Sequence, residues 1–378
     1  QYLGAKMMKD VKETIGTLFT IFLLSALVVT VVLLATGSGC LKLLNTPDES
    51  FSDALDYLNI CIGGTVFIVG YNAVSAVLRA LGDSKRPLWF VAIAAVTNIV
   101  LDLLFVGAFD MRAAGAAWAT VIAQALSFIM SVVYLKMNGF IFDFKPRSFR
   151  IHKDKLVKLV KVGLPTMAQQ TLVSFSFLAL TSLANAVGGI AGGTAIGIGG
   201  KVNSFAILPG IAMSSSIASM SGQNIGAGDY KRAVKTLKVG MGITVVIAAV
   251  VFALMQIFPE VIVDAFIGTT GGYTEQQMTE IVGTSVTYLR LLCFDSLIVS
   301  VGFCFNGLIN GSGKTMVTMI SSFVSSIGIR VPLAYILALG CDLGMLGIGI
   351  SAAVSPISTV LIGFIYYRSG VWKKKRII

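Results

Sequence analysis

Ten long apolar runs, separated by short charged clusters, dominate this chain. They lie at 15–36, 54–78, 88–108, 113–136, 161–186, 195–222, 236–258, 281–309, 315–339 and 344–367. A helix of about 20 apolar residues crosses a hydrocarbon core about 30 Å thick, so each run is long enough to span a bilayer. Only 12% of the residues are charged, compared with about 25% in soluble domains. The runs lack the two-residue alternation of barrel strands, and the sequence therefore predicts an all-α polytopic membrane protein.

The chain also repeats itself with a long period. The opening segment QYLGAKMMKDVKET, residues 1–14, matches QNIGAGDYKRAVKT, residues 223–236, at five positions. The match continues in two later pairs of segments: RALGDS with NGSGKT (79–84 and 310–315, an offset of 231), and GAAWAT with GIGISA (115–120 and 347–352, an offset of 232). Self-similarity at such a period indicates two homologous halves.

The two halves are expected to form two pseudo-symmetric helix bundles, related as parallel or inverted repeats. We expect an N-lobe at 1–137, a cytoplasmic linker at 138–160 and a C-lobe at 161–378. The C-lobe contains six of the apolar runs and the N-lobe four. Because Gln223 follows the second run of its own lobe, Gln1 is expected to follow a second span as well. The sequence thus predicts twelve spans in the native protein, of which ten are present.

Basic residues are distributed unevenly between alternate loops. Of the 29 Lys and Arg residues, 24 lie in loops on one predicted side of the membrane, and only Lys42 and Arg112 lie in loops on the other. Basic residues accumulate in cytoplasmic loops, so both termini are expected in the cytoplasm and the protein in the plasma (inner) membrane. The net charge of +11 comes mainly from these cytoplasmic loops and from the basic tail KKKRII. It therefore does not indicate nucleic-acid binding.

Asp102 lies within a predicted span, where a charge costs at least about 2.5–3.5 kcal/mol and is a candidate for function. Asn98 precedes it by four residues and shares its helix face. Thr120 lies at a similar depth, roughly 10 Å from the outer surface by helical rise, and Tyr57 lies shallower. Carboxylate, amide and hydroxyl oxygens suit a small cation such as Na⁺, with Asp102 and Asn98 at its centre. A buried carboxyl also suits a proton carrier, and a structural, hydrogen-bonded Asp is the remaining alternative.

Four charged residues stand out within spans of the C-lobe: Asp295, Lys201, Arg290 and Arg330. Asp295 and Arg290 are five residues apart and point in different directions, so an ion-pair partner for Asp295 must come from another helix. Two interpretations are open: a charged cavity wall that meets substrate, or a structural ion pair with basic side chains that reach toward the membrane surface. Five scattered cysteines and a single histidine form no metal-binding pattern, and no cofactor is expected.

Several motifs resemble those of the multidrug and toxic compound extrusion (MATE) transporters. They are RALGDSKRP, NIVLD and AAGAAWATVIAQ in the first half, and GLPTMAQQ, QNIGAGDYKRA and NGSGKT in the second. The resemblance covers essentially the whole chain and implies two six-helix lobes around a central cavity. It also implies export of organic, often cationic, compounds in exchange for sodium ions or protons. The partners that it implies are a small organic substrate and membrane lipid.

The resemblance also implies roles for particular residues. An Asn and an Asp on the fifth helix of such transporters form a cation site in the N-lobe, and Asn98 and Asp102 match them. Thr120 and Tyr57 fit a Thr of the sixth helix and a Tyr of the fourth. One branch has a Glu on the seventh helix, but the corresponding segment here is QQTLVSF, without an acid. Asp295 lies about one turn from that branch's Asp on the tenth helix, so an N-lobe site is favoured.

Three other functions are weighed against this one. A flippase for lipid-linked sugars has a related fold, and the basic residues of the C-lobe suit a phosphate-bearing substrate. A membrane-embedded enzyme needs convergent acid, base or metal ligands, which the spans lack, so no enzymatic activity is expected. A channel is the third, although a two-lobe duplication favours alternating access. We expect a monomer whose only cofactor-like requirement is the coupling ion.

Overall fold

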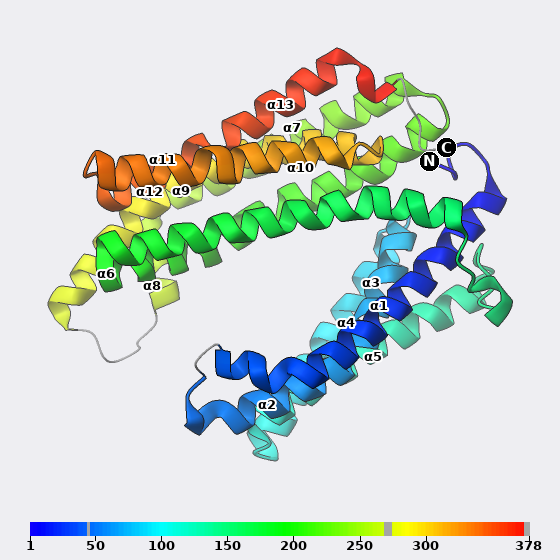
Figure 1. Cartoon of the computed structure of the whole chain (residues 1–378), viewed down its shortest axis with the longest axis horizontal. Coiled ribbons are helices and arrows are strands. Elements are labelled where there is room, and N and C mark those ends of the chain that lie inside the picture. Colours follow the sequence, from blue (N-terminus) through cyan, green and yellow to red (C-terminus); the bar gives the residue numbers. More distant parts are fainter. Residues whose placement is uncertain (44–45, 268–273, 374–378) are drawn as a thin grey trace. The chain divides into compact units, whose positions relative to one another are not determined.

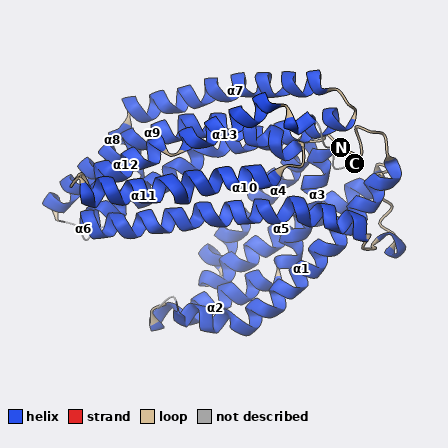
Figure 2. Ribbon diagram, turned by 45° about the horizontal axis from the view of Figure 1, so that its top comes forward, coloured by secondary structure: helices blue, strands red, loops and turns tan. Residues whose placement is uncertain are grey.

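The structure, a computed structural model, describes residues 1–43, 46–267 and 274–373. Every regular element in these ranges is a helix, and none is a strand (Figure 2). This confirms the predicted all-α class. The basic residues that follow Lys373 in the predicted C-terminal tail lie outside the described residues.

The helices are long and apolar enough to cross a membrane. Among the described residues, eight helices pass this test individually, and α2 (Asp48–Gly63) with α3 (Thr65–Ala80), which meet at a bend of 47°, passes it as a pair and counts as a ninth if it is one broken span. One of the eight, α6 (Lys153–Gly226), has 74 residues and a non-helical break at Gly189, with φ 51° and ψ −137°. This break lies between the predicted runs 161–186 and 195–222. Counting the two parts of α6 separately gives the ten predicted spans.

One compact unit comprises residues 7–159. Its elements are α1 (Met8–Leu43), α2, α3, α4 (Lys85–Asp102), the π-helix η1 (Leu103–Ala108), α5 (Arg112–Met137) and the 3₁₀ turn η2 (Pro146–Ser148) (Figure 1). Helix α5 packs against α2, α3 and α4, and α1 packs against α2 and α3. Small buried residues on more than one side of α5, such as Ala117, Ala119 and Ala123, let these helices approach closely.

The other unit comprises residues 1–6 and 160–378. After α6 it contains α7 (Tyr230–Ile257), α8 (Pro259–Ile267), α9 (Glu275–Gly311), α10 (Thr315–Phe323), η3 (Val324–Arg330), α11 (Val331–Tyr335), η4 (Ile336–Gly340), α12 (Gly344–Val354), α13 (Pro356–Ser369) and η5 (Val371–Lys373). Here α9 packs against α7, α10, α12 and α13. The α2–α3 pair makes the equivalent contacts in the first unit, which confirms two pseudo-symmetric bundles.

Local signals set several helix ends in the second unit. Helix α9 begins at a capping box in which Thr274 and Gln277 bond each other's backbone N–H groups. Helix α7 begins at Asp229, whose side chain accepts a hydrogen bond from the Arg232 N–H. Helix α13 ends at Gly370, which has a left-handed conformation with φ 67°.

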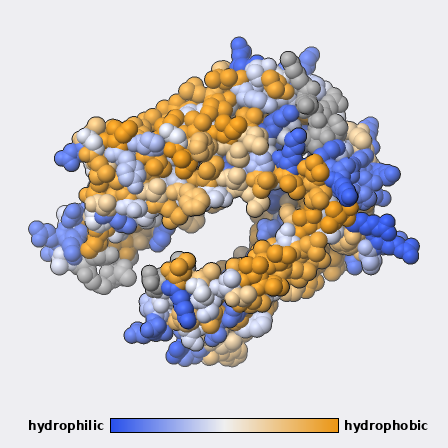
Figure 3. All heavy atoms as spheres, viewed as in Figure 1, coloured by the Kyte–Doolittle hydropathy of each residue, from blue (hydrophilic) through white to orange (hydrophobic). Residues whose placement is uncertain are grey.

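The outer faces of the helices are apolar. Val31 on α1, Leu103 beside α4 and Ile365 on α13 are 66%, 70% and 65% exposed. Figure 3 shows apolar side chains spread over much of the visible surface of the helices. Such surfaces suit lipid tails, because in water large contiguous apolar patches are rare on a monomer.

The first turn of α6 is anchored to α1. Lys155 is 3% exposed and forms ion pairs with Asp10 and, at 3.7 Å, with Glu13. The Thr17 hydroxyl of α1 accepts a hydrogen bond from the His152 N–H at 3.2 Å. Residues from the end of α5 to the start of α6, which are predicted as a linker, therefore pack within the first unit.

The two copies of the repeated motif pack against each other through glycine. A Cβ at Gly4 would overlap the carbonyl oxygen of Gln223, and a Cβ at Gly226 would overlap that of Gln1. Each of these oxygens also accepts a hydrogen bond within its own copy, from Ala227 N at 2.9 Å and from Ala5 N at 3.0 Å. The same positions in the two copies thus make the same contact with each other. Only glycine, which has no side chain, permits this approach.

We expect Gly226→Ala and Gly4→Ala to lower the thermal unfolding midpoint of the purified protein. The added methyl group must displace a backbone carbonyl, and overpacking of this kind costs roughly 1–3 kcal/mol. Gly242→Ala is the matched control, because nothing lies within 4 Å of a Cβ at that position. It should be neutral or stabilising, since alanine favours the helix. Equal midpoints for Gly226→Ala and Gly242→Ala would contradict the reciprocal contact.

Candidate functional site

Asp102 is the last residue of α4, and one oxygen of its carboxylate is buried. The Oδ1 atom of Asp102 and the Nδ2 atom of Asn98 are both buried, and neither has a hydrogen-bond partner among the described residues. Buried polar atoms are nearly always paired, so two orphans one helical turn apart require an explanation. A bound cation or proton at this position would satisfy the carboxylate.

The backbone changes its winding directly after Asp102. Residues Leu103–Ala108 form the π-helix η1, in which the Phe109 N–H donates to the Leu104 carbonyl, five residues back, at 3.0 Å. Short π-helical segments occur often at functional sites, because they disturb the regular pairing of carbonyl groups. Nothing in the apolar sequence LLFVGA signals this wide turn, so sequence reasoning did not find it.

Tyr57 comes from α2 and Thr120 from α5. Tyr57 is 42% exposed. Thr120 is half-buried on α5, which packs against both α2 and α4. No hydrogen bond of the described residues joins Thr120 or Tyr57 to Asp102. The structure therefore places all four predicted residues in one unit, on α2, α4 and α5, with α2 and α4 each packed against α5, without closing them into a network.

These residues fit a singly charged cation better than a multivalent metal. The described residues contain no group of three or more His, Cys, Asp and Glu side chains that could hold a metal ion. One carboxylate supplies one negative charge, and the Asn98 amide can present its oxygen by rotation of its terminal torsion. Hard oxygen ligands of this kind suit Na⁺, and the carboxylate alone suits a proton.

The second unit contains a different arrangement, an ion pair between Asp295 on α9 and Arg330 at the end of η3. Arg330 Nη2 donates to Asp295 Oδ1 at 2.6 Å, and Arg330 Nε donates to the Ser355 hydroxyl at 2.8 Å. Asn203 of α6 lies 3.5 Å from the other carboxylate oxygen. Asp295 is 3% exposed, so this carboxylate is satisfied inside the protein. The prediction that its partner comes from another helix is confirmed.

Lys201 and Arg290 do not join this cluster. Both are exposed, Lys201 on α6 and Arg290 on α9, and no salt bridge of the described residues involves either. Sequence reasoning had singled them out with Asp295 and Arg330 because all four are charged residues within predicted spans. It had missed Asn203 and Ser355, whose only signal is a polar side chain within an apolar run.

The repeat relates the two polar sites to each other. At the offset of 231, Tyr57 corresponds to Tyr288, and at the offset of 232 Asn98 corresponds to Arg330. Tyr288 is 2% exposed and lies near both members of the ion pair. Equivalent positions therefore carry an Asn beside an orphaned carboxylate in one unit, and an Arg paired with a carboxylate in the other.

The sequence and the fold both resemble those of known proteins. The profile of the MatE family matches residues 1–104 and 165–336, which is most of the chain. The chain belongs to the MatE family. It is similar to the probable multidrug resistance protein YpnP of Bacillus subtilis (strain 168), with 30% identity over 339 residues, which cover 89% of this chain and 73% of that protein. It is also similar to the probable multidrug resistance protein NorM of Thermotoga maritima, with 25% identity over 342 residues, 88% of this chain and 70% of that one.

Solved MATE structures share the fold. An outward-facing conformation of a multidrug resistance MATE family transporter of the MOP superfamily has a TM-score of 0.91 at 21% identity, covering 99% of this chain and 82% of that chain. A MATE in complex with MaL6 has a TM-score of 0.89 at 22% identity, with the same shares covered. This chain is therefore a multi-pass membrane transporter with the MATE fold, and not an enzyme.

Proposed function

We propose that this MATE transporter exports organic, typically cationic, compounds in exchange for Na⁺ or H⁺ by alternating access. Asp102 is the residue that binds the driving ion, with Asn98 beside it, Tyr57 on α2 and Thr120 on α5. The relatives named as multidrug resistance proteins support the substrate class. The protein works as a monomer in the plasma membrane, with both termini in the cytoplasm and no cofactor other than the coupling ion.

Asp102 is proposed as the ion-binding residue, rather than Asp295, because the two carboxylates differ in their partners. Of the two acidic residues in the middle of predicted spans, Asp295 is neutralised by Arg330 at 2.6 Å, whereas Asp102 has a buried oxygen without a protein partner. An ion that enters the second unit must compete with a guanidinium group already in place. An ion that reaches Asp102 displaces no protein group and relieves the cost of a buried, unpaired carboxylate.

Ion binding at Asp102 drives export only if it distinguishes two states of the transporter. A ligand shifts a conformational equilibrium by its differential affinity for the two states and by nothing else. A ratio of about 10⁴ in affinity is needed to move a population from 1:99 to 99:1. In this proposal the cation favours the state that takes up substrate poorly, so substrate and ion alternate on the carrier.

Efflux from vesicles tests this function. Protein reconstituted into liposomes should move a cationic dye against its gradient when an opposing Na⁺ or H⁺ gradient is imposed, and dye movement should stop when that gradient is collapsed with an ionophore. Comparing the two ions identifies the coupling ion. Translocation of a lipid-linked sugar phosphate with no ion-dependent dye movement would instead assign the chain as a flippase.

A further inference from the structure

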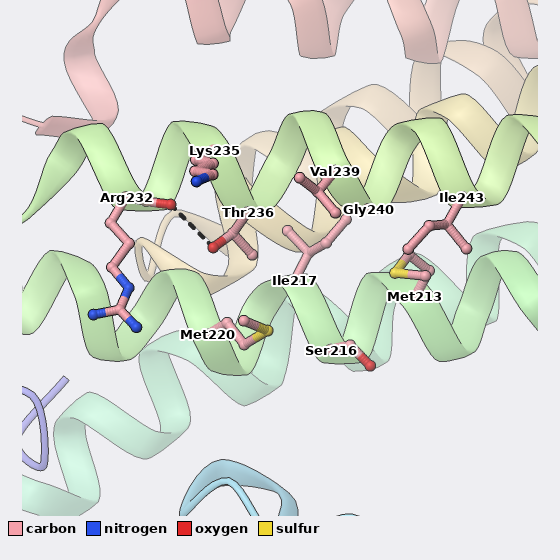
Figure 4. Close-up of a pocket in the computed structure, with 10 residues that line it drawn as sticks. All are labelled: Met213, Ser216, Ile217, Met220, Arg232, Lys235, Thr236, Val239, Gly240 and Ile243. Atoms are coloured by element: carbon pink, nitrogen blue, oxygen red, sulfur yellow. Dashed lines mark hydrogen bonds between the residues drawn. The ribbon is translucent and has the colours of Figure 1, made fainter.

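A groove runs between the second part of α6 and the start of α7. One end of the groove is cationic and the other end is apolar. Its volume is about 370 Å³, within the range of small-molecule sites. The cationic end is formed by Arg232 and Lys235, and the apolar end by Met213 and Ile243 (Figure 4). The lining residues recur at helical spacing on both helices, so one face of each helix forms each wall.

The hydroxyl groups of the groove offer no free hydrogen-bond donor to a ligand, and the rest of its lining is largely apolar. The Ser216 hydroxyl donates to its own backbone, to the Ala212 carbonyl at 3.0 Å. The Thr236 hydroxyl likewise donates to the Arg232 carbonyl at 3.0 Å, as the dashed line in Figure 4 shows. Val239 and Ile243 are 55% and 48% exposed along this stretch. A ligand that fills it must therefore be apolar.

Close packing of α6 on α7 forms the floor of the groove. A Cβ added at Gly240 would lie 2.8 Å from Ile217 Cδ1 and 3.3 Å from Met213 Sδ. Glycine at this position lets the two helices meet at the base while their outer residues diverge. Methionine side chains are flexible and adapt to apolar ligands of varied shape.

The two cations at the other end are available to a ligand. Among the described residues, no salt bridge involves Arg232 or Lys235. The carboxylate of nearby Asp229 is used to cap α7, where it accepts from the Arg232 N–H at 2.9 Å. Arginine and lysine are the side chains that bind phosphate, and basic residues at a membrane surface attract anionic lipid.

The spacing along α7 matches a molecule with an anionic head and an apolar tail. Arg232 and Val239 are seven residues apart, which corresponds to about 10 Å along a helix. The basic residues occupy the first turns of a membrane-spanning helix, where lipid headgroups lie, and the apolar wall continues into the span. We propose that this groove binds an anionic phospholipid, with its phosphate between Arg232 and Lys235 and one acyl chain along Val239 and Ile243. The site is separate from Asp102 and does not depend on the proposed function.

A pair of charge-matched variants tests the site. Arg232→Gln/Lys235→Gln removes the two groove cations, while Lys231→Gln/Lys238→Gln removes two cations of the same helix that do not line the groove. The purified chain is titrated in detergent with phosphatidylglycerol or phosphatidylcholine of identical acyl chains, and binding is measured by native mass spectrometry and thermal unfolding. We expect phosphatidylglycerol to raise the unfolding midpoint of the wild type. The groove variant should lose about 30-fold in affinity, since each cation contributes about a factor of five near an anionic surface.

The outcomes separate this proposal from its competitors. Retention of wild-type affinity by the Lys231/Lys238 variant, together with loss in the Arg232/Lys235 variant, supports the site. Equal affinity for the two lipids, or equal losses in the two variants, overturns it. Inorganic phosphate producing the same stabilisation as the lipid would show that the acyl chain is not recognised. An anionic dye that binds the groove as tightly as the lipid would reassign it as a site for soluble ligands.

Discussion

Asp102→Asn is expected to abolish ion-driven efflux while leaving the protein folded. The substitution keeps the shape of the side chain but removes the charge that would bind Na⁺ or the carboxyl that would carry H⁺. Because coupling free energies of about 1–3 kcal/mol correspond to roughly 5–150-fold changes in affinity, we expect transport under an imposed gradient to fall about tenfold or more. The measurement is dye efflux from liposomes, with thermal unfolding of the same preparations as the test of folding.

Substrate binding should behave differently from transport in this variant. Because Asp102 acts in this account through the ion, the affinity for dye without an ion gradient should change much less than the rate of efflux. Asp110→Asn is the matched control, since Asp110 follows η1 on the same segment and is exposed. Asparagine tolerates its left-handed backbone, with φ 51°. Unchanged efflux in Asp102→Asn, or an equal loss in Asp110→Asn, would reject the assignment.

Asn98 should have an intermediate effect. Asn98→Ala removes one oxygen ligand and leaves the carboxylate, so the ion should still bind, but more weakly. We expect the ion concentration for half-maximal efflux to rise while the maximal rate is largely kept. A site that carries only a proton on Asp102 predicts a smaller change, and the two variants together therefore help to separate Na⁺ from H⁺ coupling.

The fold was predictable because its signals are periodic and strong. The ten apolar runs, the positions of their charged separators and the repeat at 231–232 residues all follow from composition and spacing. Those signals also placed Asn98 and Asp102 on one helix face. They could not show that both would retain buried atoms without partners, because this depends on how closely α5 packs against α4.

The ion-pair partner of Asp295 in the second unit could not be predicted from the sequence alone. Asp295 and Arg330 are 35 residues apart, and the sequence excluded Arg290, which is on the same helix as Asp295, but left both Lys201 and Arg330 as partners from other helices. Arg330 ends the π-helix η3, which has no sequence signature, and its guanidinium contacts Asp295 in the structure. At the repeat offset of 231, Asp295 corresponds to Gly64, where the first unit bends by 47°. The halves have thus kept their packing while their polar sites have diverged.

Removing one partner of the Asp295–Arg330 pair is expected to be the most destabilising change in the second unit. The carboxylate side chain is 4% exposed and the guanidinium side chain 16%. Breaking a buried pair leaves an uncompensated charge and costs about 3–5 kcal/mol in comparable cases. Asp295→Leu and Arg330→Met should each lower the unfolding midpoint strongly in detergent, and Asp295→Leu also deprives Asn203 of its contact.

The double variant Asp295→Leu/Arg330→Met distinguishes a structural role of this ion pair from a role in substrate binding. If the ion pair is structural, Asp295→Leu/Arg330→Met should be more stable than either single variant, because apolar replacements of both partners leave no buried charge. Its ion-driven dye efflux should then also recover, since Asp102 is untouched. If the pair instead binds substrate, the double variant should fold but fail to transport, with a raised dye concentration for half-maximal efflux. Single variants as stable as the wild type would contradict both roles, because neither permits one buried charge to remain unpaired without a large cost.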